Sequence, residues 1–90
     1  PAGRQVSAKR KMYSVYVLRS LKKERRYIGM TKHLDRRLKE HNEGKNRSTK
    51  AFDPFELVYV EELESRIEAR DREKYLKSGI GREFLDDILK

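Results

Sequence analysis

Five polar side chains in this sequence could share one site and act on a phosphate group: Tyr16, Tyr27, Arg37, His41 and Glu73. Hydrolysis of a phosphodiester bond needs a group that removes a proton from water, a cation that binds the phosphate and stabilisation of the leaving oxygen. A guanidinium can bind phosphate through two hydrogen bonds, and a carboxylate can hold a divalent metal. We therefore expect phosphodiester chemistry if the fold brings these five side chains together.

The two tyrosines have two possible roles. Tyrosines in strands are usually half-buried packing residues, and that is the ordinary explanation for Tyr16 and Tyr27. A phenol has a pKa near 10 and is a poor base at neutral pH. A neighbouring cation or metal would lower this pKa, and either tyrosine could then act as a base.

His41 and Glu73 also have two interpretations each. His41 could simply lie near the end of a helix, where a positive charge favours the helix dipole, or it could bind phosphate or the attacking water. Glu73 lies in a helix full of charges and, judged alone, would face solvent. It shares a helical face with Ala69 and roughly with Leu76, which predicts that it points towards the core.

The elements that must position these residues follow from local patterns. Residues 12–18 are rich in Tyr and Val and predict a strand, and a second strand begins at Arg26. Strands this close should form an antiparallel hairpin, which would place Tyr16 and Tyr27 near one another on one face. Thr31 is the expected N-cap of a helix that ends around residues 42–44. That helix would carry both Arg37 and His41.

The second half of the chain predicts one more strand and two more helices. Residues 45–54 read as a polar loop and residues 55–63 as the third strand. Ser65 and Glu68 form a capping box that opens a helix to about Ser78. The glycines at 79 and 81 predict a break before a last helix over residues 82–89. The fold class is therefore α+β, a three-stranded antiparallel sheet flanked by helices in the order β-β-α-β-α-α.

Size and charge suggest a single small domain with a polyanionic partner. The chain has 90 residues and a net charge of +8. Residues 19–50 alone carry a net charge of +8, whereas residues 51–90 carry −4. This positive first half predicts binding to nucleic acid, although many basic domains owe their charge to solubility alone. Residues 1–11 read as a disordered basic arm, of which Pro1-Ala2-Gly3 could be an expression-vector remnant, and residues 12–90 as the folded domain.

Composition narrows the cellular setting. The chain contains no cysteine, which excludes disulfides and thiolate metal sites. No apolar run reaches the roughly 20 residues that span a membrane, and no signal-peptide core is visible. We therefore expect no membrane partner and a cytoplasmic location, associated with the nucleoid if the source is bacterial.

A family resemblance joins these observations. The pattern V-Y-V at residues 15–17, Y-I-G at 27–29, Arg37, His41 and Glu73 resemble the GIY-YIG nuclease superfamily, and the likeness covers roughly residues 13–85. Val15 stands where the family's name-giving glycine would be. The resemblance is to a small free-standing member and implies the same α+β architecture. It also implies a metal-dependent endonuclease that hydrolyses DNA in repair, recombination or processing.

The resemblance also implies residue roles. One tyrosine would activate water while the other positions the water or the phosphate, and the sequence does not say which. Arg37 rather than Arg36 would bind the phosphate, because Arg37 follows Gly29 at the family's spacing. Glu73 would bind Mg²⁺ or Mn²⁺ within an R-E-K-x-L-K pattern at residues 72–77. Magnesium suits a single carboxylate because it keeps much of its water shell.

Further residues are candidates for contact with the DNA. Gly29 would let the backbone approach the substrate or turn from strand to helix. Residues 41–50 match an H-N-x-G-x-x-x-S-T-K pattern, whose members could bind phosphate or simply close the loop. The candidate nucleic-acid-binding residues are Gly29, Lys32, Arg36, Lys45, Arg47, Ser48, Thr49 and Lys50.

Two other functions stay open at this stage. The chain could be a non-catalytic nucleic-acid-binding module that keeps the fold, or a basic domain for protein assembly. A binding module has no reason to keep a carboxylate beside two tyrosines, which favours the nuclease. No second domain that selects a target is visible, so we expect weak specificity, selectivity for DNA structure, or a targeting protein partner.

Overall fold

The sheet has three antiparallel strands with the first strand in the centre. The computed structural model describes residues 12–45 and 50–89, so the expected basic arm and three candidate DNA contacts (Arg47, Ser48 and Thr49) lie outside the described residues. The strands are β1 (Tyr13–Ser20), β2 (Arg26–Thr31) and β3 (Phe55–Leu63), in the spatial order β2-β1-β3. Within the described residues, β2 pairs with β1 alone, and its other edge is open.

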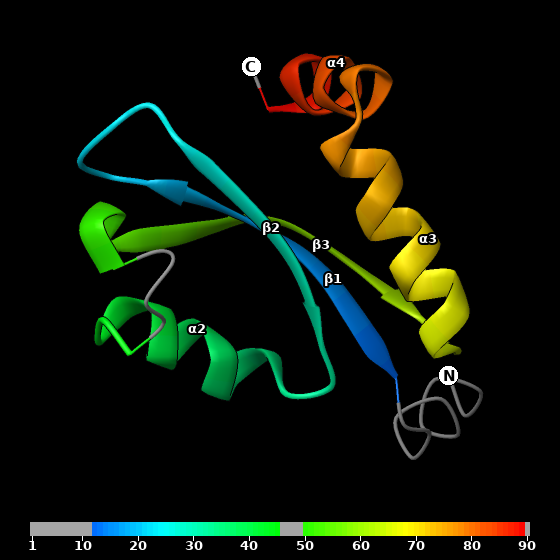
Figure 1. The fold of residues 1–90 in the computed structure, drawn as a ribbon, viewed down its shortest axis with the longest axis horizontal. Coiled ribbons are helices and arrows are strands. Elements are labelled where there is room, and N and C mark those ends of the chain that lie inside the picture. The colour runs from blue at the N-terminus through cyan, green and yellow to red at the C-terminus, as the bar shows by residue number, and fades with distance from the viewer. Residues whose placement is uncertain (1–11, 46–49, 90) are drawn as a thin grey trace, which may run out of the picture.

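Helices cover both faces of this sheet. They are α2 (Leu34–Asn42), α3 (Arg66–Lys77) and α4 (Gly79–Ile88), with a single 3₁₀ turn at Lys50–Phe52. Helix α2 lies on one side of the sheet, and α3 and α4 lie on the other (Figure 1). The expected α+β class and the order β-β-α-β-α-α are confirmed, with the 3₁₀ turn as an addition inside the expected loop.

The protein has a hydrophobic core on each face of the sheet, and the central strand β1 supplies side chains to both. Val15 and Val17 pack with Ala69, Leu76 and Leu85 from α3 and α4. The alternate residues of β1, Tyr16 and Leu18, pack on the opposite face with Phe55, Leu34 and Leu38. This alternation follows from the two-residue period of a strand, and it explains why β1 is buried almost along its whole length.

The hairpin register puts the two tyrosines on one face, as predicted. Tyr16 lies opposite Gly29 and Leu18 lies opposite Tyr27, so the tyrosines are diagonal neighbours. Their ring centroids are 6.3 Å apart. β1 is longer than expected and runs to Ser20, which shortens the connecting loop to residues 21–25.

Two expected helix boundaries were wrong. Thr31 ends β2 rather than capping α2; its hydroxyl accepts a hydrogen bond from the His33 backbone N–H at 3.0 Å, and His33 occupies the N-cap position. The glycines at 79 and 81 do not break the chain, because α4 begins at Gly79. The Ser78 hydroxyl caps α4 by accepting a hydrogen bond from the Gly81 N–H at 3.2 Å. Gly81 is required for packing, since a Cβ there would lie 1.9 Å from the Tyr75 carbonyl oxygen.

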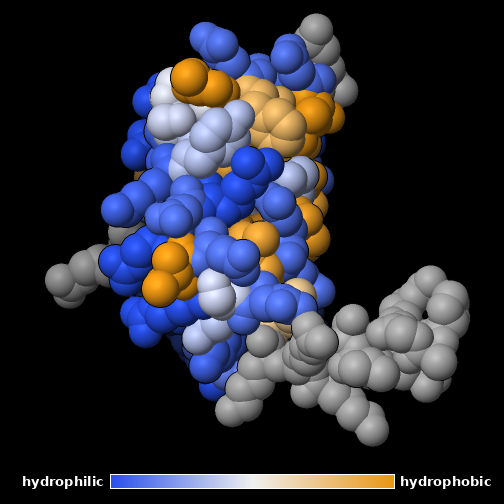
Figure 2. Space-filling model, turned by 90° about the vertical axis from the view of Figure 1, so that its right-hand side faces the viewer, coloured by the Kyte–Doolittle hydropathy of each residue, from blue (hydrophilic) through white to orange (hydrophobic). Residues whose placement is uncertain are grey.

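The face formed by α3 and α4 is mainly hydrophilic. Figure 2 shows this side of the molecule, where hydrophobic side chains form small separate groups between charged ones. Ile67 on α3 and Ile80 on α4 are among the exposed apolar residues, at 74% and 69% exposure. None of the described helices is long and apolar enough to cross a membrane.

Candidate active site

The first part of the site is a buried cluster of three rings between the hairpin and α2. The Tyr16 hydroxyl lies 3.2 Å from Nε2 of His41, and both side chains are almost fully buried. The Tyr27 ring is half-buried, with its centroid 4.7 Å from that of His41. The structure therefore brings Tyr16, Tyr27 and His41 together, from three different elements.

Burial sets the protonation of this cluster. It raises the pKa of Tyr16 well above its ordinary value, and Tyr27 raises it further. Arg37 acts to lower that pKa, but its effect is smaller, so the expectation that a neighbouring cation makes Tyr16 a usable base is not met by Arg37. Burial and then Arg37 lower the pKa of His41. At neutral pH Tyr16 is protonated and His41 is neutral, so the phenol can donate its proton to Nε2 when the imidazole proton is on Nδ1.

Gly29 makes room for the buried phenol. A Cβ atom at this position would lie 2.6 Å from the Tyr16 hydroxyl oxygen and 3.1 Å from Cε2 of Tyr27. Real side chains do not approach so closely, so any other residue would displace Tyr16 or the strand. The sequence predicted a close approach at Gly29, and the structure shows that the approaching group belongs to the protein itself.

The second part of the site is a cavity at the C-terminal end of β2. Its volume is about 440 Å³, and it is lined from both sides of the sheet by Arg37 of α2 and Glu73 of α3. The Glu73 side chain is only 19% exposed, which agrees with the expected inward direction. Its carboxylate forms an ion pair with Lys77 at 3.2 Å.

Arg37 and Arg36 both line this cavity, but they differ in exposure. The Arg37 side chain is 40% exposed and lies 3.6 Å from Glu40, whereas Arg36 is 68% exposed. Arg37 also lowers, and Glu73 raises, the pKa of Tyr16, so both charges act at the buried phenol. Arg37 therefore lines the cavity and also acts electrostatically on the ring cluster.

The expected DNA contacts fall into two groups. Lys32 and Arg36 lie at the N-terminal end of α2 and line the cavity. Lys45 and Lys50 are exposed and follow the C-terminal end of α2. The structure thus separates the two groups by the length of α2.

For two residues of the 41–50 pattern the structure favours loop closure. The Asn42 side-chain oxygen accepts a hydrogen bond from the Phe55 backbone N–H at 2.6 Å and ties the end of α2 to the start of β3. Gly44 has φ of 72°, the left-handed conformation that favours glycine at the end of a helix.

Sequence reasoning missed Arg66 and Arg70, which also line the cavity. Both lie on α3, where residues 66, 70, 73 and 77 are three or four apart and so share one face. That spacing was visible in the sequence once Glu73 was placed on the inner face. The cavity therefore has five basic side chains around one described carboxylate: Lys32, Arg36, Arg37, Arg66 and Arg70.

The donor set at Glu73 is small. Among the described residues, no group of three or more His, Cys, Asp or Glu side chains is placed to hold a metal ion. A single carboxylate still fits Mg²⁺ or Mn²⁺, which can take waters and substrate phosphate oxygens as the other ligands. The cavity around Glu73 is large enough for such a hydrated ion.

The fold and the side chains gathered at the edge of β2 define a small α+β domain with the parts of a phosphodiesterase. Residues 12–82 match the family model described as the GIY-YIG catalytic domain. The chain belongs to this family, which places it in the GIY-YIG nuclease superfamily and implies a DNA substrate.

Three curated proteins are similar to this chain. A UPF0213 protein of Clostridium perfringens is 42% identical over 67 residues, 73% of this chain and 71% of the relative. A UPF0213 protein of Natronomonas pharaonis is 40% identical over 65 residues, 71% of this chain and 75% of the relative. The UPF0213 protein YazA of Bacillus subtilis is 40% identical over 52 residues, 57% of this chain and about half of YazA, at 52%. No solved structure matches the chain.

Proposed function

We propose that this protein is a divalent-metal-dependent endonuclease that hydrolyses DNA phosphodiester bonds. The observation that carries the proposal is the meeting of Arg37 and Glu73 in one cavity, from opposite faces of the sheet and within electrostatic reach of the Tyr16 phenol. A module that only binds DNA would need the arginines of this cavity but not the inward carboxylate. The activity would serve DNA repair, recombination or processing in the cytoplasm or nucleoid. A targeting partner would provide specificity where it is required.

Each residue has a chemical task in this proposal. Arg37 binds a non-bridging phosphate oxygen and offsets the charge that grows in the transition state. Glu73 would hold Mg²⁺ or Mn²⁺, which when bound would supply Lewis-acid stabilisation of the reacting phosphate. The ion pair with Lys77, at 3.2 Å, orients the Glu73 carboxylate.

The two tyrosines have different roles in the proposed reaction because they differ in exposure to solvent. Tyr16 is 1% exposed and its hydroxyl is hydrogen-bonded to His41, so it holds the rings of the cluster in position. Tyr27 is half-buried and also lines a second cavity, so its phenol is less enclosed than that of Tyr16. We therefore assign the contact with the attacking water to Tyr27 and the positioning role to Tyr16 and His41.

The test is a cleavage panel on plasmid, flap and junction DNA with Mg²⁺ or Mn²⁺. Removing one group that stabilises a transition state typically costs about 10²- to 10³-fold in rate, and we expect losses of this size for Arg37→Ala and Glu73→Gln. Asp71→Asn removes the same charge at an exposed position of α3 and should leave the rate unchanged. Chelation of the metal should abolish cleavage.

Two outcomes would contradict the proposal. Cleavage that persists in both Arg37→Ala and Glu73→Gln would come from a contaminating nuclease. Binding that weakens with salt and survives Glu73→Gln, with no cleavage under any metal, would identify a non-catalytic nucleic-acid-binding module instead.

A further inference from the structure

A second basic cavity lies along the same open edge of β2, at the opposite end from the Arg37–Glu73 cavity. Its volume is about 590 Å³, and its described lining comes from the end of the hairpin loop, the start of β2, the end of α3 and α4. The lining residues are Glu24, Arg25, Arg26, Tyr27, Ile28, Lys77, Arg82 and Leu85. Four of these eight side chains are cations, against one carboxylate.

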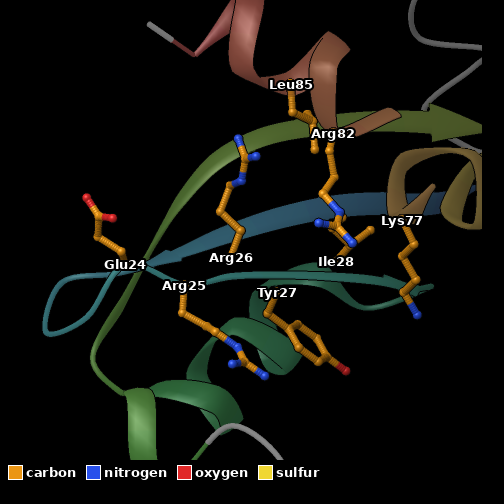
Figure 3. A pocket seen from close by; sticks show the side chains of 8 residues that line it. All are labelled: Glu24, Arg25, Arg26, Tyr27, Ile28, Lys77, Arg82 and Leu85. Atoms are coloured by element: carbon orange, nitrogen blue, oxygen red, sulfur yellow. The ribbon is translucent and has the colours of Figure 1, made fainter. Parts of the chain in front are cut away.

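The cavity wraps around the strand edge. Arg25 and Tyr27 extend towards the α2 side, whereas Arg26 and Ile28 extend towards α4 (Figure 3). This alternation follows from the two-residue period of a strand. Tyr27 therefore belongs both to the ring cluster and to the wall of this second cavity.

The four cations are not equally available to a ligand. Arg26 is bonded to Asp86 of α4 at 2.7 Å, and Lys77 is paired with Glu73 at 3.2 Å. No described carboxylate forms an ion pair with Arg25 or Arg82, and both are exposed. Arg25 lies over the Phe52 ring, 4.8 Å from its centroid, which holds its guanidinium at the cavity rim.

We propose that this cavity is a second phosphate-binding subsite, in which Arg82 and Arg25 hold the DNA backbone on the far side of Tyr27 from the Arg37–Glu73 cavity. The inference rests on the proposed function for its ligand, but not on the cleavage step. Both cavities border β2, and their linings adjoin where Lys77 of one pairs with Glu73 of the other at 3.2 Å.

The chemistry of the cavity favours a polyanion over a small acidic ligand. Its apolar floor, Ile28 and Leu85, supplies no polar group that would recognise a particular small molecule. Guanidinium groups at a rim suit a ligand whose charge continues beyond the cavity, as a phosphodiester backbone does. The neighbouring cavity of about 420 Å³ shares Glu24, Arg25 and Arg26 and adds Arg19, Lys23 and Asp86, so cations outnumber carboxylates around the hairpin as well.

The experiment measures the salt dependence of binding to a 20-base-pair duplex and to a 20-nucleotide single strand, with calcium in place of magnesium so that cleavage does not interfere. Each phosphate contact to duplex DNA contributes about 0.9 to the slope of log K against log salt. Arg82→Ala should therefore lower the slope by about 0.9 and weaken duplex binding about eightfold at 0.1 M salt. Arg82→Lys should restore most of the loss, because a lysine also contacts phosphate.

The matched control is Lys39→Ala, which removes one positive charge from an exposed α2 residue paired with Glu43. A slope unchanged in Lys39→Ala and lowered in Arg82→Ala supports the subsite. Equal slopes in the two variants would overturn it, because the effect would then be that of net charge. Lys77 is unsuitable for this test, since its loss would also release Glu73.

The proposed subsite and the proposed nuclease activity can be refuted independently of each other. If the wild-type protein binds DNA with the expected Arg82 dependence but never cleaves, the subsite stands and the proposed endonuclease falls. If it cleaves in a Glu73-dependent way and Arg82→Ala changes neither slope nor affinity, the endonuclease stands and the subsite falls. Thermal unfolding of each variant confirms that the exposed substitutions leave the fold intact.

Discussion

Gly29→Ala tests whether the buried phenol and the glycine opposite it form one packed unit. The added Cβ would lie 2.6 Å from the Tyr16 hydroxyl oxygen and 2.8 Å from its Cζ, whereas ordinary contacts begin at 3.4 Å. The ring or the strand must therefore move by most of an ångström. Overpacking of this kind costs about 1–3 kcal/mol.

The same movement breaks the bond between Tyr16 and His41, which is 3.2 Å long and buried. Loss of a buried hydrogen bond adds about 1 kcal/mol. We therefore expect Gly29→Ala to lower the free energy of unfolding by about 2–4 kcal/mol, a large share of the roughly 5–15 kcal/mol typical of small domains. Urea unfolding measures this change.

Two variants make the test specific. Gly79→Ala is the matched control, because a Cβ there meets nothing within 4 Å and should be neutral or slightly stabilising at the start of α4. Tyr16→Phe combined with Gly29→Ala removes the closest contact, so the two losses should be less than additive. Equal unfolding free energies for Gly29→Ala and Gly79→Ala would refute the reasoning.

The remaining predictions concern the C-terminal end of α2, where His41 and Asn42 lie. Burial lowers the pKa of His41 below its ordinary value of 6.5, so the unfolded chain takes up a proton more readily than the folded one. Stability should fall as the pH drops below about 6.5, and His41→Gln should reduce this dependence while the exposed His33→Gln does not, as measured by urea unfolding at pH 5 and 8. Asn42→Ala should cost about 1–2 kcal/mol because the Phe55 N–H loses its acceptor, whereas Asn42→Asp keeps an oxygen there and should cost less by the same measurement.

Local patterns in the sequence were enough to predict the elements and the fold class. One hydrogen bond of the predicted capping box is present, since the Ser65 hydroxyl accepts a hydrogen bond from the Glu68 backbone N–H at 3.1 Å. The face shared by Ala69, Glu73 and Leu76 was predicted from helical spacing alone. Predicted element boundaries were wrong where a short polar motif fits more than one structure. Thr31, for example, resembles a helix N-cap, but it ends a strand and its hydroxyl accepts a hydrogen bond from the His33 N–H.

The site itself depends on long-range geometry that local patterns do not contain. Arg37 and Glu73 meet because β2 is an edge strand, so that a helix on each face can reach around it. Nothing in the spacing of these residues specifies which strand is at the edge. The protonation state of Tyr16 could not be predicted from the sequence either, because its pKa is determined mainly by burial rather than by the nearest cation.

The double role of β1 has a consequence for how the chain folds and opens. Because Val17 packs under α3 and α4 while its neighbours Tyr16 and Leu18 pack under α2, neither half of the protein can be exposed without disturbing the same strand. The two cores should therefore unfold in one cooperative step, with the backbone amides of β1 the slowest to exchange with solvent. A site built from both halves is then present only in the fully folded chain, and partial opening would remove its charges together.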